Sequence, residues 1–174
     1  MYIQRTIEKI VKELTMQYSA ILITGPRQVG KTTMLKRLME DEGNIREYVT
    51  LDDMEERNLA KNDPAMFFQI HKPPVFIDEV QYAPELFSYI KIIIDKNHNP
   101  GDFWLTGSQI FKLMQGIQES LAGRVAVLSM SSLSQREIGG SEAIPFEINV
   151  ESLRINSKNI MPADTNQIFE RIWK

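Results

Sequence analysis

Residues 25–32 read Gly-Pro-Arg-Gln-Val-Gly-Lys-Thr, which satisfies every fixed position of the phosphate-binding pattern G-x-x-x-x-G-K-[ST]. The apolar, β-branched run at residues 20–24 precedes this stretch, and residues 33–39 follow it with apolar residues at helical spacing. A strand, a glycine-rich turn and a helix are the setting in which the pattern binds phosphate. The stretch therefore predicts an α/β fold with a site for a nucleoside triphosphate.

Each residue type in this loop has a physical role. Gly25 and Gly30 allow tight turns, so that successive backbone amides point into one concavity. Lys31 is expected to reach the β- and γ-phosphates, and the Thr32 hydroxyl to bind Mg²⁺, a hard cation that prefers oxygen ligands. Arg27 either contacts a phosphate or is an exposed loop charge. The predicted nucleotide-binding residues are Gly25, Pro26, Arg27, Gln28, Val29, Gly30, Lys31, Thr32 and Thr33.

The first 140 residues alternate between strand and helix patterns, which is typical of a parallel sheet covered by helices on both faces. An amphipathic lead-in helix is expected over residues 2–16. Asp53, Asp63 and Ser134 are predicted to cap helices. The predicted strands are 20–24, 47–51, 75–79, 102–106 and 125–130, and the later helices are one from the phosphate-binding loop to about residue 40, then 54–61, 64–71, 84–97 and 109–121.

Two carboxylates end the third predicted strand. Ligands of open α/β sheets bind at the carboxyl ends of strands, so Asp78 is predicted to anchor Mg²⁺ together with Thr32. Glu79 leaves the strand in another direction and is predicted to orient or deprotonate a water aimed at the γ-phosphate. That role belongs to hydrolysis, and kinases with a phosphate-binding loop do not need such a base here. Gln81 could hold water or a phosphate oxygen.

Further candidates follow the fourth strand. If that strand inserts between the first and the third, residues 106–108 face the γ-phosphate, and Ser108 senses it, caps the next helix, or does both. Arg124 precedes the fifth strand. In oligomeric ATPases an arginine at that junction can enter a neighbour's site, and the alternative is a surface arginine. His71 and His98 stand alone without metal-ligand spacing and are expected on the surface.

Composition and charge set limits on the class of protein. The 174 residues carry a net charge of −3 and are 43% apolar, as in a soluble globular domain without a general attraction to nucleic acid. The absence of cysteine excludes disulfides and thiolate metal sites. No membrane-spanning run and no signal peptide are found, so a cytoplasmic location is expected. Residues 141–174 are interpreted as a linker and the start of a further, truncated domain.

Several strings of residues together resemble a prokaryotic family of AAA-type ATPases. The resemblance covers residues 1–140 and implies a sheet order of 5-1-4-3-2, ATP as the nucleotide, Ser108 in the γ-phosphate-sensing region, and a second, carboxy-terminal domain of unknown function. The strings that carry it are Arg5, the loop extended to Thr33, Leu51-Asp52-Asp53, Phe76-Ile77-Asp78-Glu79-Val80-Gln81, Leu105-Thr106-Gly107-Ser108-Gln109 and Ser120-Leu121-Ala122-Gly123-Arg124.

The sequence favours an ATP-hydrolysing switch or motor, with Mg²⁺ as cofactor and an unknown protein or nucleic-acid client. Assembly into a homo-oligomer through Arg124 would complete the site. A small-molecule kinase shares the phosphate-binding loop, but Glu79 and the lack of an arginine-rich lid argue against it. A GTPase is disfavoured because no Asn-Lys-x-Asp motif follows the fourth strand. An ATP-gated scaffold with negligible turnover stays an open alternative.

Overall fold

The computed structural model describes residues 2–43, 45–108, 120–140 and 154. The chain separates into two compact units, Met1–Glu142 and Ala143–Lys174. The account below is that of the first unit. Most of the helix expected at 109–121, and all but one residue of the segment 141–174, lie outside the described residues, so both expectations stay predictions.

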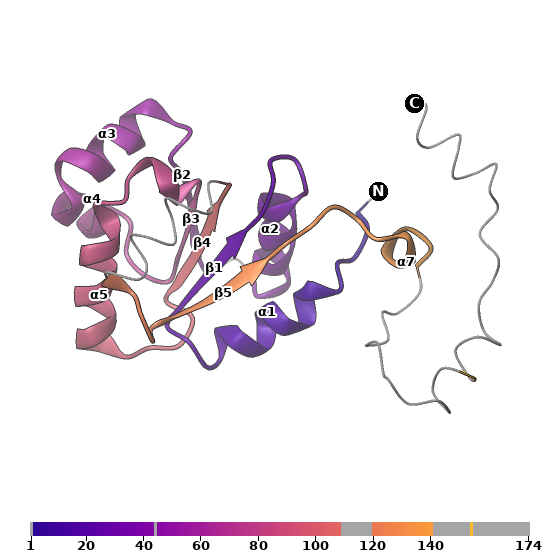
Figure 1. Cartoon of the computed structure of the whole chain (residues 1–174). Coiled ribbons are helices and arrows are strands. Elements are labelled where there is room, and N and C mark those ends of the chain that lie inside the picture. Colours follow the sequence, from indigo (N-terminus) through magenta and orange to yellow (C-terminus); the bar gives the residue numbers. More distant parts are fainter. Residues whose placement is uncertain (1, 44, 109–119, 141–153, 155–174) are drawn as a thin grey trace. The chain divides into compact units, whose positions relative to one another are not determined.

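Five parallel strands form the sheet of the first unit, in the order β2-β3-β4-β1-β5. Read from β5 to β2, this order is the predicted 5-1-4-3-2. The strand β4 lies between β1 and β3 (Figure 1). Every strand boundary falls within one residue of its prediction. The strands are β1 (Ala20–Thr24), β2 (Glu47–Thr50), β3 (Val75–Asp78), β4 (Phe103–Gly107) and β5 (Val125–Ser129).

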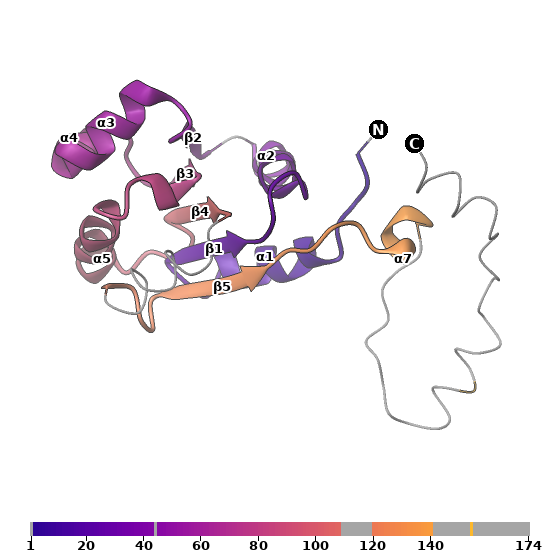
Figure 2. The ribbon, with the colours of Figure 1, turned by 45° about the horizontal axis from the view of Figure 1, so that its top comes forward.

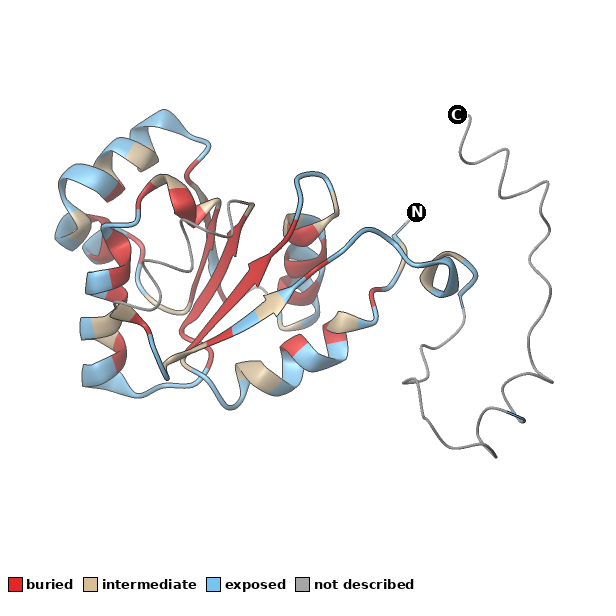
Figure 3. Ribbon diagram, in the orientation of Figure 1, coloured by how far each residue is buried: buried red, intermediate tan, exposed pale blue. Residues whose placement is uncertain are grey.

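Helices cover both faces of the sheet, which makes three layers (Figure 2). Alternate residues of β1 point to opposite faces, so Ala20 and Leu22 join one hydrophobic cluster while Ile21 and Ile23 join the other. The central strands β1, β3 and β4 are buried between the two helix layers, whereas the edge strands β2 and β5 keep exposed residues (Figure 3). One face carries α1 (Ile7–Thr15) and α2 (Lys31–Asp41), and the other carries α3 (Met54–Asn62), α4 (Pro64–Ile70) and α5 (Leu86–Asn97).

The predicted helix caps are confirmed. The Asp53 carboxylate accepts the amides of Glu55 and Glu56 at the start of α3. Asp63 caps α4, with proline at its first position. The short helix α7 (Gln135–Ile138) begins with a capping box between Ser134 and Glu137. These local side-chain bonds satisfy amide groups that the helices leave unpaired.

The lead-in helix is shorter than predicted, because α1 begins at Ile7 rather than at residue 2. The Glu8 carboxylate accepts the Arg5 amide at 2.5 Å and the Tyr2 hydroxyl at 2.7 Å. These bonds hold residues before the helix in a non-helical path. That path carries Arg5 to the phosphate-binding loop.

Two further expectations were wrong. The apolar residues of the helix predicted at 84–97, Ile92 among them, indicate heavy burial, yet Ile92 is 61% exposed in α5. It lies two residues from Ile90 and from Ile94, which are buried, and a two-residue step turns a helix by about 200°. His71, expected on the surface, is buried, with its ring nitrogens 2.8 Å from carboxylate oxygens of Glu47 and Glu56. Side-chain pairs from distant segments hold it there.

Candidate nucleotide site

The phosphate-binding loop connects β1 to α2 at the carboxyl edge of the sheet, and its two glycines are required by geometry. Gly25 has φ +145°, and a Cβ there would lie 2.1 Å from the Met130 carbonyl oxygen. Gly30 has φ +92° and caps α2. Side chains at either position would be strained. The loop therefore keeps its backbone against Met130, the residue that directly follows β5.

Lys31 is the first residue of α2 and is almost fully buried. Its ammonium group donates to the Gly25 carbonyl at 3.0 Å and to the Pro26 carbonyl at 2.8 Å. Burial lowers the pKa of Lys31, against the opposing effect of Glu79 and Asp78. The ammonium group thus lies inside the loop with only neutral hydrogen-bond acceptors, where an anion would stabilise its charge.

The predicted magnesium residues meet as expected. Thr32 Oγ1 lies 3.0 Å from both carboxylate oxygens of Asp78. The buried Thr106 hydroxyl of β4 donates to Asp78 Oδ1, and the Tyr48 hydroxyl of β2 donates to Oδ2 at 3.2 Å. Burial, followed by the charge of Asp78, raises the pKa of Tyr48 to about 12, so the phenol keeps its proton. Three strands therefore fix the Asp78 carboxylate beneath Thr32.

Glu79 leaves β3 in a left-handed conformation, with φ 58° and ψ 44°, which is uncommon for a residue other than glycine. The Thr106 hydroxyl accepts the Glu79 amide at 3.1 Å and helps to hold this turn. The Glu79 carboxylate accepts the Ser108 hydroxyl at 3.3 Å and the Gln81 amide. Glu79 and Asp78 thus point to different places, and Ser108 lies beside the predicted water-activating group.

A hollow of about 520 Å³ opens in front of these groups. Its volume lies within the range of small-molecule sites. Of the predicted nucleotide residues, Gly25, Pro26 and Val29 do not line it, and Asp78 lies behind Thr32. Two lining residues, Asp52 and Tyr82, had no predicted role. The lining residues are Arg27, Gln28, Gly30, Lys31, Thr32, Thr33, Asp52, Glu79 and Tyr82.

The oxygen groups at this hollow fit a magnesium ion. Mg²⁺ is usually held by one or two carboxylates together with substrate phosphates and water. Thr32 and Asp78 would supply a hydroxyl and a carboxylate of that kind. No cluster of three or more histidine, aspartate or glutamate side chains suited to a metal occurs among the residues that the structure describes. A cation here would therefore depend on a bound polyphosphate to complete its ligands.

Arg124 lies away from its own phosphate-binding loop. It directly precedes Val125, which pairs with Ala20 at the amino end of β1, whereas the loop follows the carboxyl end of that strand. The two places are about 15 Å apart along the sheet. The guanidinium group makes two bonds to the Asp95 carboxylate, at 2.5 and 3.0 Å. Within one chain Arg124 is therefore an ion-pair partner of α5, and its action in a neighbouring site stays a prediction.

Arg5 is a residue that the sequence analysis named only within the family resemblance. Its buried guanidinium group donates to the Val29 carbonyl at 2.8 Å, to the Ser131 carbonyl at 2.7 Å and to the Glu137 carboxylate at 3.1 Å. It thus ties the phosphate-binding loop to the segment after β5. The sequence hardly reveals this contact, because the position of a single arginine before a helix does not indicate that it reaches a loop 24 residues later.

The strand order, the glycine-rich loop after β1 and the carboxylates at the end of β3, with β4 between these two strands, define a P-loop nucleoside triphosphatase fold of the AAA type. Residues 17–139 match a family model described as an AAA domain, and the chain belongs to that family. Two relatives are uncharacterised proteins, Rv2008c of Mycobacterium tuberculosis and Mb2031c of Mycobacterium bovis. Each is 35% identical over 123 residues, which cover 71% of this chain and 27% of the relative. The chain thus spans about a quarter of their length.

Solved structures agree on the fold. The RuvB Holliday junction branch migration motor of Thermotoga maritima aligns over 79% of this chain and 49% of its own, with a TM-score of 0.53 at 17% identity. AMPPCP-bound DnaA from Aquifex aeolicus aligns over 95% of this chain and 57% of its own, with a TM-score of 0.51 at 15% identity. No helix among the described residues is long and apolar enough to cross a membrane.

Proposed function

We propose that this chain binds ATP with Mg²⁺ and hydrolyses it, and that the nucleotide state drives a conformational change in a larger protein. The observation that carries the proposal is the separation of two carboxylates at the end of β3. Asp78 is fixed beneath Thr32, while Glu79 faces Ser108 and the hollow. This arrangement supports the proposal that Asp78 binds the cation and that Glu79 activates the water.

The residues of the site divide the work as follows. The loop amides and Lys31 bind the β- and γ-phosphates, because desolvated charge-assisted bonds are strong. Thr32 and Asp78 hold the magnesium ion, which when bound neutralises charge on the phosphates. Glu79 accepts a proton from the attacking water, and Ser108 fixes the carboxylate that does so. Such a base contributes roughly 10²–10⁴-fold to the rate.

Two other functions share the binding site. In an ATP-gated scaffold the nucleotide binds and is hardly turned over, and in a small-molecule kinase the γ-phosphoryl group passes to an acceptor. The position of Glu79 beside the hollow favours water as the acceptor. A nucleic-acid client is supported only by fold analogy with RuvB and DnaA, and a protein client is an equal candidate.

Calorimetry of ATP binding with Mg²⁺, paired with steady-state phosphate release, tests the proposal. We expect binding, release of phosphate without any added acceptor, and loss of release when Mg²⁺ is chelated. Binding without release would favour the scaffold. Release that requires an added small-molecule acceptor would favour the kinase. Absence of binding would contradict the assignment of the site. The release assay repeated with DNA and RNA tests the nucleic-acid client.

A further inference from the structure

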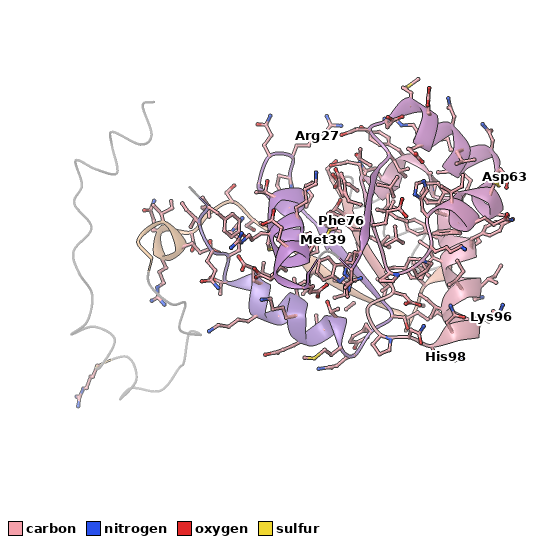
Figure 4. The ribbon with its side chains drawn as sticks, turned by 180° about the vertical axis from the view of Figure 1, so that it is seen from behind. Arg27, Met39, Asp63, Phe76, Lys96 and His98 are labelled. Carbon is pink, nitrogen blue, oxygen red and sulfur yellow. The ribbon has the colours of Figure 1, made fainter. Side chains whose placement is uncertain are left out.

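Arg27 lies at the outer end of the phosphate-binding loop and points away from the interior, where Met39 and Phe76 pack (Figure 4). Its guanidinium group lines the hollow and donates to the Tyr82 hydroxyl at 3.1 Å. Tyr82 follows Glu79 by three residues. The bond therefore brings the Arg27 charge to the wall of the hollow that carries the predicted water-activating carboxylate.

The Arg27 charge has no carboxylate within 4.0 Å among the described residues. Other arginines of the same part of the chain contrast with it, since each of five has a carboxylate within that distance. The closest of these contacts range from 2.5 to 3.9 Å. The paired arginines are Arg5, Arg37, Arg46, Arg57 and Arg124.

A second cation lies close to Arg27. Lys31 and Arg27 both line the hollow, and the Lys31 ammonium group donates to the carbonyls of Gly25 and Pro26, the two residues before Arg27. Two cations that face one hollow repel each other, and an anion between them would remove that repulsion. The two cations therefore favour a ligand that carries more negative charge than Lys31 and the loop amides could neutralise by themselves.

Tyr82 is a fixed but weak partner for Arg27. The Arg57 guanidinium group of α3 lies 4.0 Å from the centre of the Tyr82 ring, and Arg57 Nε donates to the Leu51 carbonyl at 2.6 Å. These contacts hold the phenol in place. Its hydroxyl is neutral, and a charge-assisted bond to a phosphate is about twice as strong as a neutral one. Arg27 would therefore exchange the hydroxyl for a phosphate oxygen.

We propose that Arg27 recognises the terminal phosphate within its own chain and so determines the preference for ATP over ADP, with Tyr82 holding the side chain ready before the nucleotide binds. The inference rests on the proposed function, because it needs the same site to bind ATP. Loop amides and Lys31 are available to both nucleotides. Arg27 lies on the Glu79 side of the hollow, where only a triphosphate places an additional charge.

The test is calorimetric titration of the chain with ATP and with ADP, each with Mg²⁺. Arg27→Ala should weaken ATP binding by roughly tenfold to a hundredfold, the usual range for one charged hydrogen bond, and leave ADP binding unchanged. Arg27→Lys should recover part of the loss. Arg37→Ala is the matched control, since Arg37 is an exposed arginine of α2 paired with Glu40, and it should bind both nucleotides as the wild type does.

Tyr82→Phe keeps the ring on which Arg57 stacks and removes only the hydroxyl. It should weaken ATP binding much less than Arg27→Ala does, because it removes only the group that positions Arg27 before ATP binds, and Arg27 leaves that hydroxyl when ATP binds. A loss as large as that of Arg27→Ala would overturn the exchange. Equal effects of Arg27→Ala on ATP and ADP, or none on either, would overturn the inference and leave the proposed function intact. A wild-type chain that binds neither nucleotide would overturn both.

Discussion

Cations at the two edges of the sheet have different partners. At the amino edge, Arg46 donates to the Glu42 carboxylate at 3.1 Å and to the Gly101 carbonyl, and it stacks on Trp104 at 4.0 Å. At the carboxyl edge, within the part of the chain that the structure describes, Lys31 donates to loop carbonyls and Arg27 to a phenol, and neither has a carboxylate partner. Arg46 at the amino edge and Arg5 at the carboxyl edge are neutralised by carboxylates, whereas Lys31 and Arg27 line a hollow.

This difference separates contacts that build the fold from groups reserved for a ligand. His71, at the amino edge, likewise lies between two carboxylates. Asp102 is less well satisfied there, because burial raises the pKa of its carboxyl and its Oδ2 has no partner among the described residues. A buried charge without a partner is costly, so the buried Lys31 ammonium group, which has no carboxylate partner among the described residues, points to an anion bound in the hollow.

Arg124 is expected to give the largest effect on activity. It lies at the amino edge and is paired with Asp95, so a catalytic role for it would contradict the contrast between the two edges. If it acts in a neighbour's site, activity per chain should rise with protein concentration, by about 10³–10⁵-fold for a complete oligomer. Arg124→Ala should remove this rise and leave ATP affinity nearly intact. The measurement is phosphate release against protein concentration.

A mixture of Arg124→Ala with Glu79→Gln refines the same test. Each chain carries one defect, so a mixed oligomer contains interfaces at which both residues are intact. Activity of the mixture above that of either variant supports the role in trans. An inactive mixture, together with wild-type activity that does not depend on concentration, would mean that the Arg124 pair with Asp95 only stabilises the fold.

Replacing Lys31 tests the carboxyl edge. Lys31→Ala removes a buried ammonium group from the phosphate site, and ATP affinity should fall on the order of a hundredfold or more. Thermal stability should hardly change, because the lost bonds go to loop carbonyls that water can satisfy. Titration with ATP and Mg²⁺ measures the loss. Lys12→Ala, which removes an exposed lysine of α1 paired with Asp41, is the control and should bind normally.

Replacing Arg46 tests the opposite edge. Arg46→Ala breaks a buried ion pair and exposes one face of Trp104, so the free energy of unfolding should fall by about 2–3 kcal/mol. ATP affinity of the folded protein should stay within about twofold, because Arg46 and the hollow lie at opposite edges of the sheet. Urea unfolding and nucleotide titration measure the two effects. If Arg46→Ala lowered ATP affinity without lowering the free energy of unfolding, Arg46 would belong to the ligand site and not to the contacts that stabilise the fold.

Glu137 provides the smallest and most pH-dependent effect. Burial alone would raise its pKa, but the amides of Ser134 and Thr6 and the Arg5 guanidinium group outweigh burial and lower the pKa to about 2. The folded pKa is below the ordinary value of 4.5, so this stabilisation is complete above about pH 4.5 and is lost as the pH falls toward 2.

Glu137→Gln should therefore lower the free energy of unfolding at pH 7 by about 1–2 kcal/mol, a figure reduced for solvent near α7. The stability of the variant should also vary less between pH 4.5 and 2 than that of the wild type. Urea unfolding over this range measures both effects. Parallel pH curves for the two proteins would contradict the account. Glu40→Gln, on the exposed side of α2, is the control.

The fold was predictable because local signals agree with the global arrangement. The phosphate-binding loop, the apolar strands and the helix caps at Asp53 and Asp63 are all readable within a few residues. The sheet order came from the family resemblance rather than from the residues. The grouping of Thr32, Asp78 and Glu79 was also predictable, because carboxyl ends of parallel strands share one edge.

The rest depended on contacts between distant segments. Arg5 reaches Val29 and Ser131, and His71 finds Glu47 and Glu56, through side-chain pairs with no sequence spacing to reveal them. Tyr82 and Asp52 line the hollow only because β2 and β3 are neighbours in the sheet. Loops bring functional side chains together in ways that periodicity does not encode.

The central claim is that the carboxyl edge binds ATP with Mg²⁺ and activates water through Glu79. Its most direct test compares ATP affinity and the rate of phosphate release for wild type and Glu79→Gln. Glutamine keeps the shape and the hydrogen bonds but cannot accept the proton. The account predicts unchanged affinity and a rate lower by roughly 10²–10⁴-fold. Equal rates of phosphate release in the two proteins would contradict it.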